Sequence, residues 1–198
     1  MARVEDGASG DQLSGVAHRL TLVGYRACGK STVGRLAAAR LGWPFVDADA
    51  VVEEALGQPI RAFFAEHGEA AFRDAEAATL ARILAKAGCL VLATGGGAVL
   101  REENRALFAS QGGLVAYLHA PAEALQARLR HHAGARPSLT GAGVADEVPA
   151  LLALRDPLYR PVAGVVVDAT RGTAAVADEL HRLVANDERR TSNHEPGP

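Results

Sequence analysis

Gly24-Tyr-Arg-Ala-Cys-Gly29-Lys30-Ser31 fits the pattern G-x-x-x-x-G-K-[ST], the phosphate-binding loop (P-loop) of nucleotide-binding proteins. The apolar segment Leu20–Val23 precedes it and predicts a buried strand, and residues 30–41 follow it with apolar residues at helical spacing. Glycine allows successive N–H groups to form a concave nest for a phosphate, and the helix start adds unpaired donors. A chance Gly-rich turn is the alternative interpretation. Because every part occurs in the required order, we predict a loop that binds a nucleoside triphosphate.

The side chains of the loop carry the expected chemistry. Lys30 would place its ammonium between the β- and γ-phosphates, and the Ser31 hydroxyl would be a ligand of Mg²⁺. Further contacts to the nucleotide are expected from the rest of the loop and the first helical turn, namely Gly24, Ala27, Cys28, Gly29 and Thr32.

Composition limits the possible classes of protein. The 198 residues correspond to one domain, and a formal charge of −2 gives no reason to expect a nucleic acid or an anionic membrane as partner. No run approaches the length of a membrane span and no signal-peptide core is present, so we expect a cytoplasmic protein. Cys28 and Cys89 form neither a metal pattern nor a disulfide framework. Residues 1–17 and 187–198 are polar, without periodicity, and predict a disordered leader and tail around a domain spanning 18–186.

Short apolar strands alternate with helical patterns between the two tails. The expected strands are Leu20–Val23, Pro44–Val46, Cys89–Ala93, Leu114–Leu118 and Gly164–Val167. The expected helices are Lys30–Leu41, Ala50–Leu56, Ile60–His67, Glu69–Lys86, Glu102–Gln111, Ala122–His131, Glu147–Asp156 and Ala174–Ala185. Continuous apolar strands indicate burial on both faces, as in a parallel sheet, so we predict an α/β fold with ligands at the carboxyl ends of the strands.

Two aspartates follow the second expected strand. Alternation along a strand would put Asp47 and Asp49 on one side as it ends. One carboxylate could hold a Mg²⁺-bound water while the other accepts a hydrogen bond from a hydroxyl substrate. The alternative is an Asx-turn or N-cap for the next helix.

An arginine and a run of glycines are candidates for binding an acceptor. Arg73 lies three residues before Glu76 on an expected helix, and its fork suits a carboxylate, although a solvated pair is the usual outcome of this spacing. Gly95, Gly96 and Gly97 follow a strand and would let a ligand approach the backbone closely, unless they form a plain flexible turn.

The segment from Arg128 to Leu139 is rich in arginine and contains Gly and Pro. This composition is typical of a mobile lid that brings positive charge over a transferring phosphate. Arg155 and Tyr159 follow after a short helix, and by default such arginines lie on the surface.

Taken together, these motifs resemble the shikimate kinase family over about residues 19–184. The P-loop alone is shared by many families, so the resemblance depends on the ordered set of the P-loop, Asp47-x-Asp49, Gly68-Glu-x-x-Phe-Arg73-x-x-Glu76, Gly95-Gly-Gly97, Arg136-Pro and Arg155-x-Pro-x-Tyr159. The resemblance implies a three-layer α/β/α P-loop kinase fold with a five-stranded parallel sheet in the order 2-3-1-4-5. It also implies a shikimate-binding part at about 48–80 and a lid at about 130–145.

The resemblance implies transfer of the γ-phosphoryl group of ATP to the 3-hydroxyl of shikimate, with Mg²⁺ as cofactor, ATP and shikimate as partners, and a monomer. Residues expected to bind shikimate are Asp49, Arg73, Glu76, Gly95, Gly96, Gly97 and Arg155. Lys30 and Arg136 would stabilise the transferring phosphoryl group, Asp49 would accept the proton, and Asp47 with Ser31 would position Mg²⁺. Arg130 and Arg171 are expected near adenine.

Two other interpretations stay open at this point. Another small-molecule kinase of this fold, such as a gluconate kinase, has a similar P-loop and acidic strand end, but the Phe72-Arg73-x-x-Glu76 and Arg155-x-Pro-x-Tyr159 pairings argue against it. A nucleotide-binding module without catalysis is the second. No Asn-Lys-x-Asp motif is present, which disfavours a GTPase switch, and the catalytic set is complete.

Overall fold

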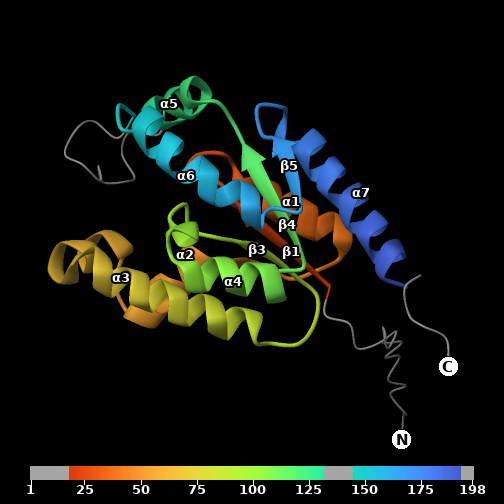
Figure 1. The fold of residues 1–198 in the computed structure, drawn as a ribbon, viewed down its shortest axis with the longest axis horizontal. Coiled ribbons are helices and arrows are strands. Elements are labelled where there is room, and N and C mark those ends of the chain that lie inside the picture. Colours follow the sequence, from red (N-terminus) through yellow and green to blue (C-terminus); the bar gives the residue numbers. More distant parts are fainter. Residues whose placement is uncertain (1–17, 132–144, 193–198) are drawn as a thin grey trace, which may run out of the picture.

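The protein folds around a five-stranded parallel sheet, seen in a computed structural model that describes residues 18–131 and 145–192. The strands are β1 (Arg19–Val23), β2 (Phe45–Asp47), β3 (Leu90–Ala93), β4 (Leu114–His119) and β5 (Val165–Asp168). Their order in space is β2-β3-β1-β4-β5, and every neighbouring pair is parallel (Figure 1). This confirms the predicted fold class and the predicted strand order.

The central position of β1 explains where the site forms. β1 pairs with β3 in the register Leu22↔Ala93, and β3 in turn pairs with β2 in the register Asp47↔Ala93. The segments that follow these three strands therefore emerge side by side at one edge of the sheet, as is usual for ligand sites in parallel sheets. These segments are the P-loop, the glycine run 95–97 and the aspartate pair.

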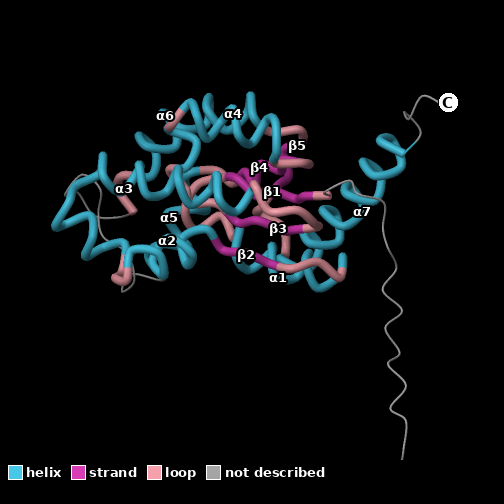
Figure 2. The backbone as a smooth tube through the Cα atoms, turned by 90° about the horizontal axis from the view of Figure 1, so that it is seen from below, coloured by secondary structure: helices cyan, strands magenta, loops and turns pink. Residues whose placement is uncertain are grey.

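Helices cover both faces of the sheet and complete the three layers (Figures 1 and 2). They are α1 (Lys30–Leu41), α2 (Ala48–Leu56), α3 (Ile60–Leu84), the 3₁₀ turn η1 (Ala98–Leu100), α4 (Glu102–Gln111), α5 (Ala122–His131), α6 (Val148–Val162) and α7 (Thr173–Ser192). Both views place α3 and α7 at opposite ends of the molecule.

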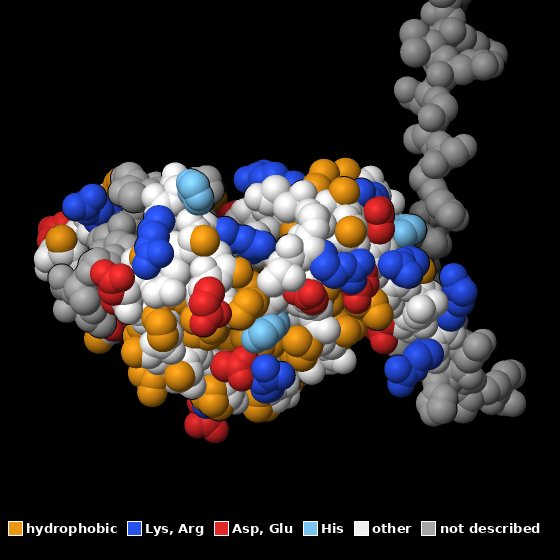
Figure 3. Space-filling view, turned by 90° about the horizontal axis from the view of Figure 1, so that it is seen from above, with side chains coloured by type: hydrophobic (Ala, Val, Ile, Leu, Met, Phe, Trp, Pro, Cys, Tyr) orange, Lys and Arg blue, Asp and Glu red, His pale blue; other side chains and the backbone are white. Residues whose placement is uncertain are grey.

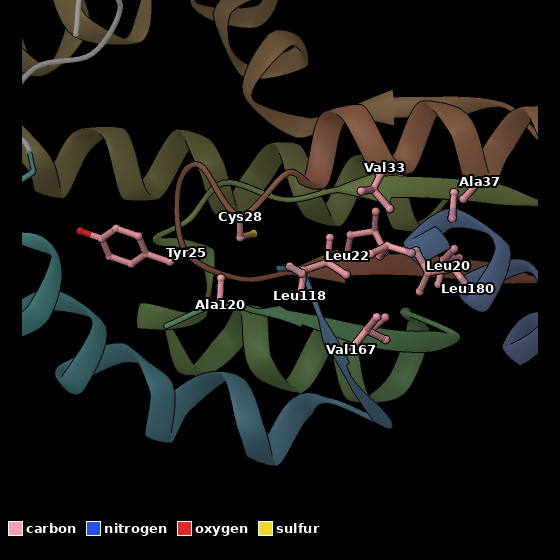
Figure 4. Close-up of a cluster of buried hydrophobic side chains, with 14 of the residues drawn as sticks. Leu20, Leu22, Tyr25, Cys28, Val33, Ala37, Leu118, Ala120, Val167 and Leu180 are labelled. Carbon is pink, nitrogen blue, oxygen red and sulfur yellow. The ribbon is translucent and has the colours of Figure 1, made fainter. Parts of the chain in front are cut away.

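The core consists of two apolar clusters, one on each face of the sheet. Leu20 and Leu22 of β1 point to the first, where they meet α1, α5 and α7, and Figure 4 shows Leu22 with Val33, Ala37 and Leu180. Val23 belongs to the second cluster, together with residues of α3, α4 and α6. Because side chains alternate along a strand, burial on both faces requires the near-continuous apolar strands seen in the sequence.

Several helix boundaries differ from the sequence prediction at their starts and breaks. α2 begins at Ala48 instead of Ala50, because Asp47 caps it: its carboxylate accepts a hydrogen bond from the Asp49 amide at 3.1 Å. The two helices predicted over 60–67 and 69–86 run as one element, α3, which is broken only by the extended, positive-φ conformation of Gly68 (φ 78°). Glycine adopts that conformation without steric cost. The break therefore lies at Gly68, between the two helices that the sequence predicts.

The two C-terminal helices are longer than predicted. α6 continues past Asp156 to Val162 although it contains Pro157 and Pro161, each of which removes one helical hydrogen bond. Burial of Tyr159 and a 2.8 Å hydrogen bond from the Tyr117 hydroxyl to Asp156 hold this part of the helix on β4. α7 extends to Ser192 instead of ending at Ala185, so the predicted boundary between domain and tail at 186/187 falls inside a helix. The predicted leader and most of the predicted lid lie outside the described residues.

One face of the molecule shows how charged side chains are distributed over the described residues. Basic and acidic side chains alternate over the face drawn in Figure 3, without an extended basic area. Within residues 18–131 and 145–192, no helix combines the length and the apolar character that crossing a membrane requires.

Candidate active site

The P-loop connects β1 to α1 and forms a cradle at the carboxyl edge of the sheet. Gly24 has φ 145° and Gly29 has φ 103°, values that other residues rarely adopt. A Cβ at Gly24 would lie 2.7 Å from the Leu118 carbonyl oxygen, so this position also requires the smallest residue. The Lys30 ammonium donates to the carbonyls of Gly24 at 2.7 Å and Tyr25 at 3.1 Å, which fixes the curvature of the loop.

A hollow of about 210 Å³ lies over this cradle. It is lined by Ala27, Gly29, Lys30, Ser31, Thr32, Asp47, Asp49, Thr94 and Gly96. Of the seven predicted contacts between Gly24 and Thr32, five line this hollow, and Gly24 and Cys28 do not. The Cys28 side chain is buried in the core below the loop (Figure 4), so only its backbone can face a ligand.

Asp47 and Asp49 both line this hollow, but they belong to different elements, which the sequence did not predict. Asp47 ends β2, but Asp49 lies in the first turn of α2, so strand alternation does not align them. Asp47 acts both as N-cap and as acceptor of a 2.6 Å hydrogen bond from the Ser31 hydroxyl. The two interpretations offered for this carboxylate, a helix cap and a metal-site residue, are thus compatible.

The Ser31 and Asp47 oxygens fit the requirements of Mg²⁺. This hard cation takes oxygen ligands and commonly binds through one or two protein groups plus phosphates and water. Among the described residues, no group of three or more His, Cys, Asp or Glu side chains forms a metal site of its own. A hydroxyl and a carboxylate beside a phosphate cradle match a metal that arrives with its nucleotide.

A second hollow, of about 440 Å³, adjoins the first. Its lining consists of Arg26, Asp49, Glu53, Pro59, Ile60, Arg61, Phe64, Phe72, Arg73, Glu76, Gly95, Gly96, Gly97 and Arg155. Asp49 and Gly96 line both hollows, so a group bound in one faces a group bound in the other. The sequence predicted seven residues around an acceptor, and all seven line this second hollow.

Arg73 is oriented on α3 by carboxylates on two sides. Its Nη1 donates to Glu76 at 2.6 Å, and its Nε and Nη2 donate to Glu69 at 3.2 and 3.1 Å. The Arg73 side chain is 11% exposed, and its guanidinium carbon lies 5.0 Å from the centre of the Phe72 ring. The pair is therefore partly buried and fixed, unlike the solvated surface pair that this spacing usually produces.

Glu76 is the most deeply buried carboxylate of the hollow. Burial raises the pKa of the Glu76 carboxyl above its ordinary value, and the charge and hydrogen bond of Arg73 oppose that shift. Arg73 therefore favours the ionised form of Glu76, and Glu76 in return holds the guanidinium in place.

This coupling predicts a pH-dependent stability difference for Arg73→Ala. Loss of the opposing charge raises the pKa of Glu76 further in the folded chain. A carboxyl with a raised folded-state pKa contributes stability fully below its unfolded pKa of about 4.5 and loses it as pH rises through the folded pKa. The decrease in unfolding free energy caused by Arg73→Ala should therefore be larger at about pH 8 than at about pH 5, measured by denaturant unfolding.

Arg101→Ala is the matched control, because it removes an exposed ion pair with Asp74 on the same helix. Its effect on unfolding free energy should be small and nearly equal at both pH values. Equal losses at both pH values for Arg73→Ala would contradict the coupling to Glu76.

The three glycines of residues 95–97 let charged side chains approach the backbone. A Cβ at Gly95 would lie 2.6 Å from Glu76 Oε1 and 2.7 Å from Asp49 Oδ1, and a Cβ at Gly97 would lie 2.7 Å from the Arg73 guanidinium carbon. Larger residues at these positions would displace the groups that line the second hollow. The glycine run is therefore a requirement of the site and not a plain flexible turn.

Gly97→Ala should raise the KM for the acceptor by roughly 10-fold, because the methyl group displaces Arg73 from its bidentate position. The KM for ATP should stay within about 2-fold of the unmodified protein, since Gly97 does not line the P-loop hollow. Gly164→Ala is the control, because a Cβ there meets only ordinary contacts, the nearest at 3.6 Å. Steady-state kinetics with each substrate varied in turn measures both effects, and an unchanged acceptor KM in Gly97→Ala would refute this explanation.

Arg155 and Tyr159 of α6 reach the same glycine. Arg155 is 6% exposed and donates to the Gly96 carbonyl at 3.4 Å. Burial raises the pKa of the Tyr159 hydroxyl, which therefore stays protonated and donates to the same carbonyl. Arg155 is thus a buried site residue and not the surface arginine that its isolated position in the sequence would suggest.

Arg130 and Arg171, the arginines predicted near adenine, do not line the hollow over the P-loop. Arg130 is exposed at the end of α5. Arg171 pairs with Glu179 and lines a separate hollow on α7. Arg136 lies outside the described residues.

Arg128, which the sequence interpretation assigns to no contact, reaches the P-loop. Its guanidinium donates to the carbonyls of Ala27 and Cys28, both at 3.3 Å, and to Ala169 after β5 at 2.6 Å. The available signal was helical spacing, because Arg128 lies one turn after the buried Leu125 and flanks the inward face of α5.

This fold and this site define a class of protein. A P-loop at the end of β1, with a carboxylate and a hydroxyl for a metal beside it, and an adjoining arginine-lined hollow, are the parts of a P-loop kinase that acts on a small molecule.

Comparison with known proteins agrees with this class and narrows it. The model of the shikimate kinase family matches residues 26–185. A shikimate kinase from Nitratidesulfovibrio vulgaris is 47% identical over 84% of this chain and 95% of its own length. The structure of shikimate kinase from Acinetobacter baumannii in complex with shikimate superimposes with a TM-score of 0.80 and 34% identity, covering 88% of this chain and 96% of that one. The chain belongs to the shikimate kinase family.

A gluconokinase from Sinorhizobium meliloti is also structurally similar. Its TM-score is 0.64 at 22% identity, over 90% of this chain and 98% of that one, and likeness at this level reflects the shared fold alone. The gluconate kinase alternative is therefore not favoured.

Proposed function

We propose that this chain transfers the γ-phosphoryl group of ATP to the 3-hydroxyl of shikimate, which yields shikimate 3-phosphate and ADP. The observation that carries the proposal is the junction of the two hollows at Asp49 and Gly96, with Arg73 and Arg155 in the second hollow. Two guanidinium groups suit the carboxylate of a ring acid, and the shared wall brings its hydroxyl toward the phosphate cradle.

The residues of the cradle act on the donor. Lys30 neutralises charge that develops on the transferring group, and the backbone amides of the loop hold the phosphates. Arg136 is proposed to add a second cation from the lid, in the segment outside the described residues. Mg²⁺ that arrives with ATP would be held by the Ser31 hydroxyl and, through water, by Asp47, and would supply positive charge that neutralises the phosphates.

The residues of the second hollow act on the acceptor. Arg73 and Arg155 hold the carboxylate, Glu76 orders Arg73, and Asp49 accepts a hydrogen bond from the ring hydroxyl that attacks the phosphoryl group. Transfer of this kind requires in-line placement and charge neutralisation more than a strong base. We assign Arg128, from its contacts to the P-loop and to Ala169, to the border of the nucleotide site.

We further infer that the protein acts in the cytoplasm. We also infer that it acts as a monomer, since side chains of a single chain line both hollows. A sedimentation-velocity experiment with both substrates present should give one species of monomer mass. A dimer that alone carries activity would contradict this inference.

An acceptor panel tests the proposed reaction. ADP release should require shikimate and should be at least about 100-fold slower with gluconate, whose open chain does not fit two fixed guanidinium groups. ADP release that is independent of any acceptor, or that prefers gluconate, would overturn the proposal.

A further inference from the structure

The P-loop carries an aromatic side chain that faces two guanidinium groups. The Tyr25 ring is buried, 1% exposed, and the guanidinium carbons of Arg26 and Arg155 lie 5.7 and 5.6 Å from its centre. In Figure 4 the ring extends from the loop away from Leu22, Val33 and the other labelled side chains of its cluster. Within the described residues the Tyr25 hydroxyl forms no hydrogen bond although it is buried. The ring face, and not the hydroxyl, is therefore the part that interacts.

Arg26 is joined to the start of α6 by a buried ion pair. Its Nη2 lies 2.8 Å from Glu147 Oε2, and the two side chains are 9% and 0% exposed. Glu147 immediately precedes α6, the helix that carries Arg155. Because an unpaired charge at this depth is strongly unfavourable, the pair ties the P-loop to α6 and neutralises Arg26.

The arginines that line the second hollow differ in whether they form ion pairs. Arg73 pairs with Glu69 and Glu76, and Arg26 pairs with Glu147. Arg155, in contrast, forms no ion pair within the part of the chain that the structure describes, and its contacts there are the Tyr25 ring, the Gly96 carbonyl and the Tyr159 side chain. Its charge is therefore available to an anionic ligand, and neutral contacts set its position.

We propose that Tyr25 and the Arg26–Glu147 pair are positioning residues that set the guanidinium of Arg155 for the acceptor carboxylate. Tyr25 supplies the face on which Arg155 rests. Glu147 cancels the charge of Arg26, which would otherwise repel Arg155 from the same ring. This inference rests on the proposed function, since it assumes that the acceptor carries a carboxylate.

Two substitutions of Tyr25 test the role of the ring. Tyr25→Phe keeps the face and should leave every kinetic constant within about 2-fold, whereas Tyr25→Leu should raise the KM for shikimate by roughly 10-fold. The KM for ATP should change little in both, because the Tyr25 side chain does not line the P-loop hollow. An equal rise of both KM values in Tyr25→Leu would indicate a collapsed loop and would overturn the proposal, as would unchanged constants.

A double-mutant cycle tests the charge pair. Glu147→Gln alone should raise the shikimate KM by roughly 10-fold, and adding Arg26→Met should return it to within about 3-fold of the unmodified protein, since the uncompensated charge is gone. If Arg26 instead contacted shikimate directly, the double variant would stay impaired, and the proposal would be wrong. Thermal melting of each variant identifies any that fail to fold, and the double variant, in which both charges of the pair are removed, provides the decisive comparison.

These outcomes are separable from failure of the proposed function. Shikimate-dependent ADP release by the unmodified protein is measured first. If it is absent, the proposed function fails. If it is present and the Tyr25→Leu and Glu147→Gln variants match the unmodified protein, only the positioning role fails.

Discussion

Replacement of Lys30 by methionine is expected to lower kcat by about 100-fold or more, with a smaller effect on the KM for shikimate. The ammonium is the only lysine charge in the cradle, and its hydrogen bonds to the Gly24 and Tyr25 carbonyls also shape the loop. Methionine keeps much of the side-chain volume but supplies neither the charge nor the donors. A pre-organised cation at a transferring phosphoryl group acts mainly on the transition state, so the loss should appear in kcat.

The sequence provides a matched control for this prediction. Lys86 is the other lysine of the chain, and it is exposed after α3, far along the sequence from the P-loop. Lys86→Met should leave kcat and both KM values nearly unchanged. A Lys30→Met protein that keeps more than about a tenth of the original kcat would refute the role assigned to Lys30.

Replacement of Arg73 by alanine is expected to raise the KM for shikimate by roughly 10- to 100-fold, while the KM for ATP changes little. Arg73 lines the second hollow and not the first, and carboxylates on both sides hold its fork. Arg73→Lys should recover only part of the loss, because an ammonium cannot form the planar two-bond contact.

A neutral form of the acceptor tests the interaction between Arg73 and the acceptor carboxylate separately from other contacts. The methyl ester of shikimate should bind the unmodified protein weakly, and Arg73→Ala should affect its KM much less than it affects the KM for shikimate. Arg101→Ala serves as the control for general charge, because that arginine pairs with Asp74 outside the hollow. Equal effects of Arg73→Ala on the acid and its ester would show that Arg73 does not recognise the carboxylate.

The features that were predictable from sequence are those encoded locally. The P-loop has a fixed spacing because glycines and a helix start are needed at set positions. The strand order was implied only by the resemblance to the shikimate kinase family. The Arg73–Glu76 contact was predictable from the sequence because residues three apart on a helix are neighbours. The burial of this pair was not predictable, since the glycine run 95–97 and Arg155, which line the same hollow, belong to distant segments.

The structure differs from the sequence-based predictions where tertiary contacts override local preferences. Proline normally ends a helix, yet α6 continues through Pro157 because Tyr159 and Asp156 are held against the sheet. Asp49 was assigned to a strand end, whereas the cap formed by Asp47 starts the helix earlier. The Arg26–Glu147 pair joins residues 121 positions apart, a separation at which a single sequence carries no pairing signal.

The central claim is that a phosphate cradle and a carboxylate clamp meet at Asp49 and Gly96. A crystal structure with shikimate and a non-hydrolysable ATP analogue tests it most directly. The claim predicts the shikimate carboxylate between Arg73 and Arg155 and its 3-hydroxyl beside Asp49, facing the terminal phosphate above Lys30. A ring bound with its carboxylate turned away from both guanidinium groups, or bound outside the second hollow, would contradict it.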